Sequence, residues 1–349
     1  MKPHPSKKNS GAGSSGKINS GQVNSGAASH GPLNTGNKDS GTWKSDTGSS
    51  GKINSGAANS GSRRSGTGKI ADWTVAGMLS WGTDFFRSRK VPSPRLSIEW
   101  LLSDVLSLKR LDLYLQYDRP LSSEEKDRLR PLILRRANHE PLQYITGYTD
   151  FHRITLRVTP DVLIPRPETE QLVERILEDH GSQEPLRFLD AGTGSGCIAL
   201  AVKKARPAWD VTAIDISQEA LAVARENAAS LGLDISFQPC GFETFRTKDK
   251  MGIIASNPPY VHPEDAVSMQ REVLEYEPRE ALFVEDAETL YKGLLAMCRD
   301  NLDTNGAFYF EINESDGAHV QKLCNDKPFT ARLLRDYSGK DRFISGRFE

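Results

Sequence analysis

The chain has 349 residues, a formal net charge of −1 and four cysteines. The cysteines are scattered without a Cys-x-x-Cys spacing, which argues against a disulfide framework or a zinc site and favours reduced thiols in a cytoplasmic protein. No apolar run is long enough to span a bilayer, and no apolar segment follows the basic N-terminus, so the sequence predicts neither a membrane span nor a secretory signal.

Residues 1–68 differ in composition from the rest of the chain. Glycine recurs at every fifth residue, mostly after serine, at Gly11, Gly16, Gly21, Gly26, Gly31, Gly36, Gly41, Gly51, Gly56, Gly61 and Gly66. The repeat carries almost no apolar side chains, so ordering it would cost chain entropy with little burial in return. We expect residues 1–68 to be a disordered low-complexity tail. The tail is a solvated leader, translated repeat DNA ahead of the true start, or a segment with a specific binding role.

Charge is distributed unevenly between this tail and the remainder. The tail holds nine Lys and Arg residues against two Asp, which makes it +7 and leaves −8 on residues 69–349. A protein body that grips a nucleic-acid backbone is usually basic. The acidic body therefore predicts a protein or small-molecule partner and no direct nucleic-acid binding, although the tail could attract anionic surfaces weakly. The length of the body suggests two domains.

Residues 69–147 are predicted to form a small helical domain. A first helix is indicated by large apolar side chains at roughly helical spacing, namely Trp73, Met78, Leu79, Trp81, Phe85 and Phe86. A second helix runs over 95–106 after Pro94, which suits a first-turn position. Ser122 and Glu125 have the spacing of a capping box and predict the start of a third, longer helix.

A hairpin or linker region is predicted over 148–170, with a short β stretch of alternating apolar character at 151–158. The following Leu163-Ile-Pro-Arg-Pro-Glu-Thr-Glu170 leads into a helix that extends to Leu177. Within it, Arg166 and Glu168 have two possible roles. They form a structural ion pair at a helix-entry turn, or they make a wall of a cofactor or substrate pocket.

From residue 171 to 349, strands and helices alternate. Strands are expected at 186–190, 210–214, 234–238, 251–256, 306–312, 331–336 and 342–348, and helices at 197–205, 218–231, 287–301 and 315–325. This alternation predicts an α/β fold with a doubly wound, mostly parallel seven-stranded sheet, in which the last two strands could pair antiparallel at an edge.

A glycine-rich turn follows the first of these strands. Asp190-Ala-Gly-Thr-Gly-Ser-Gly196 has the spacing G-x-G-x-G, which differs from the G-x-G-x-x-G of dinucleotide sites. An acid just before the turn suits a ligand with an amine-bearing end and disfavours a pyrophosphate. Asp215 ends the second strand, where a carboxylate can bind a ribose diol. Together these residues suggest S-adenosylmethionine as the ligand.

A second motif, Asn257-Pro258-Pro259-Tyr260, ends the strand at 251–256. Two consecutive prolines cannot continue a sheet ladder, so the chain must leave the sheet there. Asn257 then lies at the carboxyl end of the sheet, where ligands bind in open α/β folds. Its carboxamide offers a donor and an acceptor. It can therefore hold a flat, NH2-bearing group, whose face Tyr260 can cover.

These motifs resemble those of class I S-adenosylmethionine-dependent methyltransferases. The chain from about residue 70 resembles one family more closely, the peptide chain release factor N5-glutamine methyltransferases (the HemK/PrmC family). This closer resemblance rests on Leu163–Glu170, on the helical segment predicted over 69–147 and on Glu140-Pro-Leu-Gln-Tyr-Ile-Thr-Gly147. The resemblance implies methyl transfer from S-adenosylmethionine to the glutamine of the release factor GGQ motif, with release factors as partners. It implies cofactor-binding residues Asp190, Gly192, Thr193, Gly194, Ser195, Gly196, Asp215, Phe242 and Asn257. It implies substrate-binding residues Asn257, Pro258, Pro259 and Tyr260, of which Asn257, Pro258 and Tyr260 serve in catalysis.

The chain departs from the family at Gly241, which stands where an acid often precedes the aromatic residue over the adenine. The mechanism implied is positional: the Asn257 side-chain oxygen and the Pro258 carbonyl accept the amide hydrogens, and no catalytic His or Cys is required.

His152, His262 and His319 are expected to be surface or packing residues, and Cys197 a small helix residue facing the sheet. The competing hypotheses are an adenine-N6 methyltransferase acting on DNA or RNA, and a non-catalytic scaffold.

Overall fold

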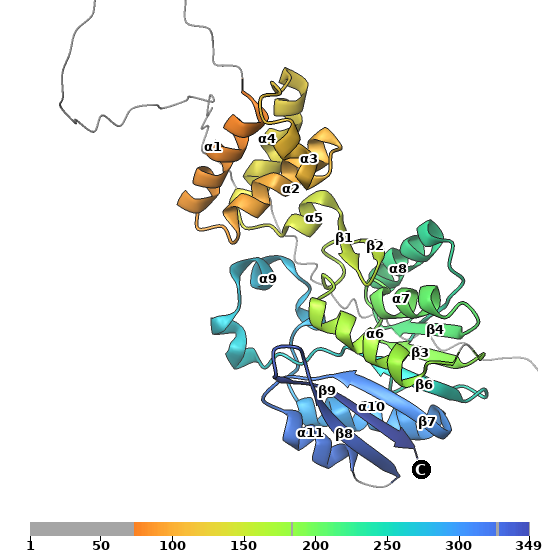
Figure 1. Cartoon of the computed structure of the whole chain (residues 1–349). Coiled ribbons are helices and arrows are strands. Elements are labelled where there is room, and N and C mark those ends of the chain that lie inside the picture. The colour runs from red at the N-terminus through yellow and green to blue at the C-terminus, as the bar shows by residue number, and fades with distance from the viewer. Residues whose placement is uncertain (1–72, 183, 326–327, 349) are drawn as a thin grey trace, which may run out of the picture. The chain divides into compact units, whose positions relative to one another are not determined.

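The computed structural model describes residues 73–182, 184–325 and 328–348, so the predicted tail lies outside the described residues. Its first part is helical (Figure 1). The helices are α1 (Val75–Ser88), α2 (Pro94–Leu106), α3 (Arg110–Leu115), α4 (Ser123–Ala137) and α5 (Leu142–Thr146). The three predicted helices correspond to α1, α2 and α4, whereas the short α3 and α5 were not predicted. No helix among the described residues combines the length and apolar character needed to cross a membrane.

Local sequence accounts for how these helices begin. The Ser122 hydroxyl accepts from the Glu125 N–H at 3.1 Å, and the Glu125 carboxylate accepts from the Ser122 N–H at 2.8 Å. This is the predicted capping box, which satisfies two otherwise unpaired backbone donors at the start of α4. Pro94 occupies the first turn of α2, where its missing N–H costs nothing.

A two-stranded hairpin follows, formed by β1 (Tyr148–Phe151) and β2 (Ile154–Arg157). A hairpin therefore lies within the region predicted as hairpin or linker, whereas the β stretch expected at 151–158 is interrupted by a turn after Phe151. The tight turn falls on His152 and Arg153, which both have positive φ, 38° and 66°. Two-residue hairpin turns of this kind normally carry Asn or Gly, so the turn left no recognisable signal in the sequence.

The second part is a seven-stranded sheet in the order β5-β4-β3-β6-β7-β9-β8. Its strands are β3 (Arg187–Ala191), β4 (Asp210–Asp215), β5 (Ser236–Pro239), β6 (Met251–Ser256), β7 (Leu302–Glu311), β8 (Phe329–Arg335) and β9 (Asp341–Phe348). All pairings are parallel except β7–β9 and β9–β8. The predicted strands and the antiparallel pairing of the last two are confirmed, with β9 inserted between β7 and β8. The strand order reverses between β3 and β6, so the carboxyl ends of β3, β4 and β6 border a crevice suited to ligands.

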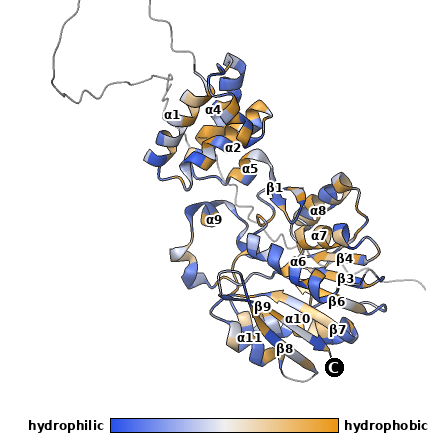
Figure 2. Ribbon diagram, in the orientation of Figure 1, coloured by the Kyte–Doolittle hydropathy of each residue, from blue (hydrophilic) through white to orange (hydrophobic). Residues whose placement is uncertain are grey.

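Helices cover both faces of this sheet, as a doubly wound fold requires. They are α6 (Pro167–Asp179), α7 (Cys197–Ala205) and α8 (Gln218–Leu231) on one face, and α10 (Ala287–Asn301) and α11 (Gly317–Cys324) on the other. Each face has its own apolar core. Phe188 and Val211 pack with side chains of α6 and α7, while Leu189 and Phe308 pack with those of α10 and α11. Figure 2 shows hydrophobic residues along much of the sheet between these helix layers.

An irregular stretch that was not predicted lies between β6 and α10. It contains η1 (Pro263–Ser268), α9 (Arg271–Tyr276) and η2 (Arg279–Ala281). Its two ends are joined where the Val261 N–H donates to the Leu282 carbonyl at 2.9 Å and the Val284 N–H donates to the Val261 carbonyl at 3.0 Å. We refer to residues 261–284 as the insert segment. It begins directly after Asn257-Pro-Pro-Tyr260 and so extends from the carboxyl edge of the sheet.

Candidate active site

The glycine turn between β3 and α7 has a backbone that only glycine adopts easily. Gly192, Gly194 and Gly196 have φ of 73°, 55° and 84°, in the left-handed region. At Gly196 a Cβ would also lie 2.8 Å from a methyl group of Leu200, so the close approach of the turn to α7 requires the absence of a side chain. The three glycines therefore fix a narrow turn that exposes backbone at the sheet edge.

Asp190 lies beneath this turn. Its carboxylate is fully buried and accepts from the Thr193 hydroxyl at 2.6 Å and from the Ala199 N–H at 3.1 Å. Burial raises the pKa of Asp190 to about 7, although both hydrogen bonds oppose the shift. Asp190 does not line the cavity described next. It connects β3, the turn and the first turn of α7, and so supports the shape of the glycine turn.

Asp215, at the end of β4, faces the turn. Its carboxylate accepts from the Gly194 N–H at 2.8 Å and from the Ser217 N–H at 2.9 Å. A carboxylate has about four lone-pair positions, so these two bonds fix its orientation and leave acceptor capacity toward the cavity. Asp215 is half-buried and lines the cavity described next.

A cavity of about 370 Å³, here the glycine-loop cavity, opens above these residues. It is lined by residues of the turn, including Gly192, Thr193, Gly194 and Ser195, by Asp215 and Phe242, and by Asn257, Pro258 and Pro259. A Cβ at Gly293 would lie 2.7 Å from the Phe242 ring, so this glycine of α10 lets the ring pack closely. Ile216 and Leu290 add apolar surface to the same wall. One part of the cavity is thus polar backbone and carboxylate, and the other is flat and apolar.

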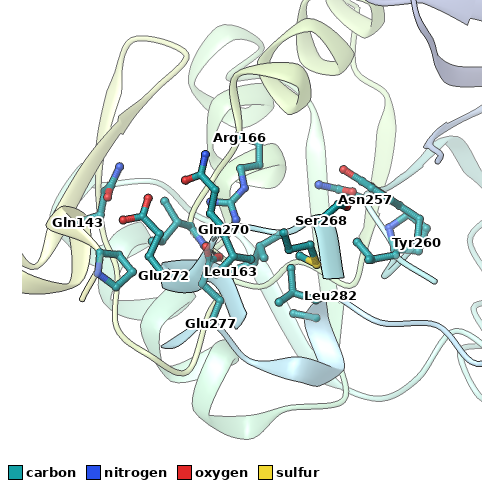
Figure 3. A pocket seen from close by; sticks show the side chains of 17 residues that line it. Gln143, Leu163, Arg166, Asn257, Tyr260, Ser268, Gln270, Glu272, Glu277 and Leu282 are labelled. Carbon is teal, nitrogen blue, oxygen red and sulfur yellow. Dashed lines mark hydrogen bonds and ion pairs between the residues drawn. The ribbon is translucent and has the colours of Figure 1, made fainter. Parts of the chain in front are cut away.

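A second cavity of about 470 Å³, here the insert cavity, lies beside the first. Figure 3 shows Asn257 and Tyr260 at one end of it and Gln143, from α5, at the other. Its remaining walls come from the insert segment and from residues 163–166. Asn257 and Pro258 line both cavities, so the two spaces meet at the predicted catalytic motif.

The Asn257 carboxamide has a defined partner. Its Nδ2 donates to the Thr169 hydroxyl, 3.0 Å away in the first turn of α6. Nearby, the Tyr260 hydroxyl donates to Glu311 at 2.8 Å, and the Tyr260 carbonyl accepts from Asn313 Nδ2 at 3.1 Å. The Pro-Pro corner and these bonds hold both side chains at the end of β6.

Arg166 takes both roles considered from the sequence, a structural ion pair and a pocket wall, but its ion-pair partner is not the predicted one. It pairs with Glu277 of the insert segment at 2.6 Å rather than with Glu168. Glu277 also accepts from the Ile164 N–H at 3.1 Å. Burial raises the pKa of Glu277, and Arg166 opposes this shift. Arg166 and Glu277 both line the insert cavity, so the ion pair joins its two walls.

The three histidines singled out in the sequence line neither cavity. His152 is in the β1–β2 turn, His262 lies 2.9 Å from the carboxylate of Asp316, and His319 is exposed. Cys197 packs against the core between α7 and the sheet, as predicted, and it also lines the glycine-loop cavity. Burial raises the pKa of its thiol, which is therefore no thiolate nucleophile. Within the described residues, no three His, Cys, Asp or Glu side chains are grouped to hold a metal.

Thr169 and Glu311 were missed by the sequence reasoning. Thr169 lines the glycine-loop cavity and contacts Asn257, and Glu311, on β7, accepts from Thr169 at 2.8 Å. A sequence signal for Glu311 did exist, since a single carboxylate in the apolar strand Phe308-Tyr-Phe-Glu-Ile312 is unusual in a buried position. Nothing in the sequence connected it to Asn257.

The chain is similar to known proteins over both its helical segment and its sheet-containing part. The model of the PrmC N-terminal domain matches residues 78–147, and that of the methyltransferase small domain matches 168–282. The release factor glutamine methyltransferase of Leptospira interrogans is 37% identical over 78% of this chain and 97% of its own length. Those of Chlorobaculum tepidum (36%, over 78% and 97%) and Streptococcus pneumoniae (42%, over 64% and 80%) are similar as well.

Proposed function

The chain belongs to the release factor glutamine methyltransferase family, and on that premise we propose that it methylates the side-chain amide nitrogen of the GGQ glutamine in peptide chain release factors. The observation that carries the proposal is that Asn257 lines both cavities. A methyl donor in one cavity and a glutamine reaching through the other would meet at its carboxamide. Because release factors act in translation, the cytoplasm is the proposed location.

S-adenosylmethionine is the proposed methyl donor, bound in the glycine-loop cavity. The residues present suit its three parts. Backbone of Gly192 to Ser195 can approach the amino-acid end closely, while the buried Asp190 and the close packing of Gly196 on α7 shape the turn. Asp215 keeps acceptor capacity for the ribose diol. Phe242 offers a flat apolar surface for the adenine. No acid precedes Phe242, but Glu243, the next residue, lines the same cavity.

When bound, this cofactor supplies an electrophilic methyl carbon. The remaining work falls to the chain's own residues. A carboxamide nitrogen is a poor nucleophile because its lone pair is delocalised into the carbonyl. The Asn257 Oδ1 and the Pro258 carbonyl would each accept one N–H of the substrate amide and aim its nitrogen at the donor cavity. Orientation of this kind can supply most of the rate enhancement, while acceptors facing the developing positive charge add to it. Tyr260 would cover the flat group. The surplus proton can leave afterwards, so no strong base is needed.

The test is methyl transfer from labelled S-adenosylmethionine to an unmethylated release factor, compared with duplex DNA and RNA. We expect label on the release factor only, and none when its GGQ glutamine is replaced by alanine. Asn257→Ala should reduce the rate at least a hundredfold, because both orientation and charge stabilisation are lost. Label on adenine of nucleic acid but not on the release factor would contradict the proposal and favour an adenine methyltransferase. No label on any substrate, with S-adenosylmethionine still bound, would favour a non-catalytic role.

A further inference from the structure

We propose that Thr169 and Glu311 are positioning residues, which hold the Asn257 carboxamide with its oxygen turned toward the substrate. The inference rests on the proposed function, since it concerns how the same amide is gripped. It assigns roles to two residues that the motif Asn-Pro-Pro-Tyr does not contain.

The three side chains form a chain of hydrogen bonds from the sheet to the cavities. Glu311 is fully buried at the carboxyl end of β7, next to β6. One of its oxygens accepts from the Thr169 hydroxyl at 2.8 Å, and the Thr169 oxygen lies 3.0 Å from Asn257 Nδ2. Thr169 is itself almost fully buried, 1% exposed, so water does not substitute for these partners.

The direction of these bonds follows from the number of protons available. An ionised carboxylate can only accept, so Thr169 must give its one hydroxyl proton to Glu311. The Thr169 oxygen is then left as an acceptor, and only the NH2 end of Asn257 can donate to it. A flipped amide would place two acceptor oxygens about 3 Å apart with no proton between them. Glu311 therefore determines, through Thr169, that Asn257 Oδ1 is the atom free to accept from the substrate amide.

This arrangement depends on the charge of Glu311. The groups that face it are Thr169 and Glu168 from α6, Tyr260 from the end of β6 and Arg342 from β9. Cys197 from α7 and Tyr291 from α10 also interact with it electrostatically. Burial is the largest influence and raises the pKa of Glu311 to about 7. Below that pH the neutral acid can donate a proton itself. Thr169 is then free to donate to Asn257 Oδ1, and the wrong amide orientation becomes accessible. Methyl transfer should therefore fall as pH is lowered through about 7.

Thr169→Val and Thr169→Ser form the matched pair of test variants. Valine keeps the shape of threonine and removes the hydroxyl, whereas serine keeps the hydroxyl. We expect Thr169→Val to lower kcat for release factor methylation about five- to tenfold, the worth of one hydrogen bond, and Thr169→Ser to restore the rate to within about twofold. Binding of the release factor in the presence of S-adenosylhomocysteine should weaken less than about threefold, since the contact surface is unchanged. Thermal melting shows whether each variant is folded.

Two further measurements separate positioning from a merely structural role. In the Asn257→Ala background, Thr169→Val should have no additional effect on kcat, because the amide that it positions is gone. The acid limb near pH 7 should disappear in Thr169→Val. In Tyr260→Phe it should persist but move to higher pH, because the lost hydrogen bond from Tyr260 lowers the pKa of Glu311. Equal rates for the valine and serine variants, or independent effects of Thr169→Val and Asn257→Ala, would overturn the inference. A wild-type enzyme inactive on release factor would instead contradict the proposed function.

Discussion

Arg136, on α4 of the helical segment, lies 2.5 Å from the carboxylate of Glu272, on α9 of the insert segment. The Arg136 side chain is almost fully buried, and it also donates to Ser97 Oγ at 3.1 Å and to the Glu140 carbonyl at 2.8 Å. A second hydrogen bond joins the same two segments, from the Tyr276 hydroxyl to the Asn138 carbonyl at 2.9 Å. The helical segment is thus bonded directly to a wall of the insert cavity.

Replacing Arg136 by leucine should therefore affect both stability and substrate use. The change leaves several buried acceptors and the Glu272 carboxylate without their donor, which should lower the free energy of unfolding by about 2–3 kcal/mol. The KM for release factor should rise because the insert segment loses its support, with a smaller change in kcat. Urea denaturation and steady-state kinetics measure the two effects. Arg128→Leu, at an exposed position of the same helix, is the control and should change stability by less than about 0.5 kcal/mol. Equal losses in the two variants would show that burial of Arg136 does not matter.

Asp215→Asn should weaken cofactor binding. The carboxylate accepts from two backbone N–H groups, of Gly194 and Ser217, whereas an amide has only one oxygen. One N–H must then face the NH2 group, and the acceptor proposed for the ribose is lost as well. We expect the Kd for S-adenosylhomocysteine, measured by calorimetry, to rise at least tenfold. Asp210→Asn, at the exposed start of the same strand, should leave that Kd unchanged. An unaltered Kd in Asp215→Asn would place the ribose elsewhere.

Gly194→Ala and Gly232→Ala separate backbone strain from ligand binding. Both glycines have positive φ, 55° and 64°, and at neither would a Cβ meet another atom within 4 Å. Each alanine should therefore cost about 1 kcal/mol of stability through strain alone. Gly194 lines the glycine-loop cavity and Gly232 ends α8, so only Gly194→Ala should also weaken S-adenosylhomocysteine binding. Melting temperatures and calorimetry test this, and a matching loss of affinity in Gly232→Ala would argue against a local effect.

The sequence was sufficient to predict the features that depend on neighbours in the chain. The strand before Asn257, the glycine turn after Asp190 and the capping box at Ser122 each carry their signal within a few residues. The strand ends then brought Asp215 and Asn257 to one edge of the sheet, because parallel strands share a carboxyl side.

Contacts between distant segments were not predictable in the same way. Asn257 meets Thr169 across 88 residues and Thr169 meets Glu311 across 142, so their association depends on where α6 starts and on β7 pairing with β6. The ion pair of Arg166 with Glu277 crosses 111 residues. The insert segment was missed because its helices are short, with no apolar periodicity long enough to recognise.

Asp190 should make the stability of the protein depend on pH. Its pKa is about 7 in the folded protein because it is buried, against about 4 for an ordinary aspartate. Between these values the folded state holds a proton that the unfolded state has released, so the free energy of unfolding falls as pH rises through this window. Asp190→Asn lacks the titrating group, and it should lose less stability than the wild type between pH 5 and 8, by about 1–3 kcal/mol. Glu311 is present in both proteins, so its own contribution cancels in the comparison. Urea denaturation at pH 5, 6, 7 and 8 measures the difference, and parallel stability curves for the two proteins would show that Asp190 ionises without cost in the fold.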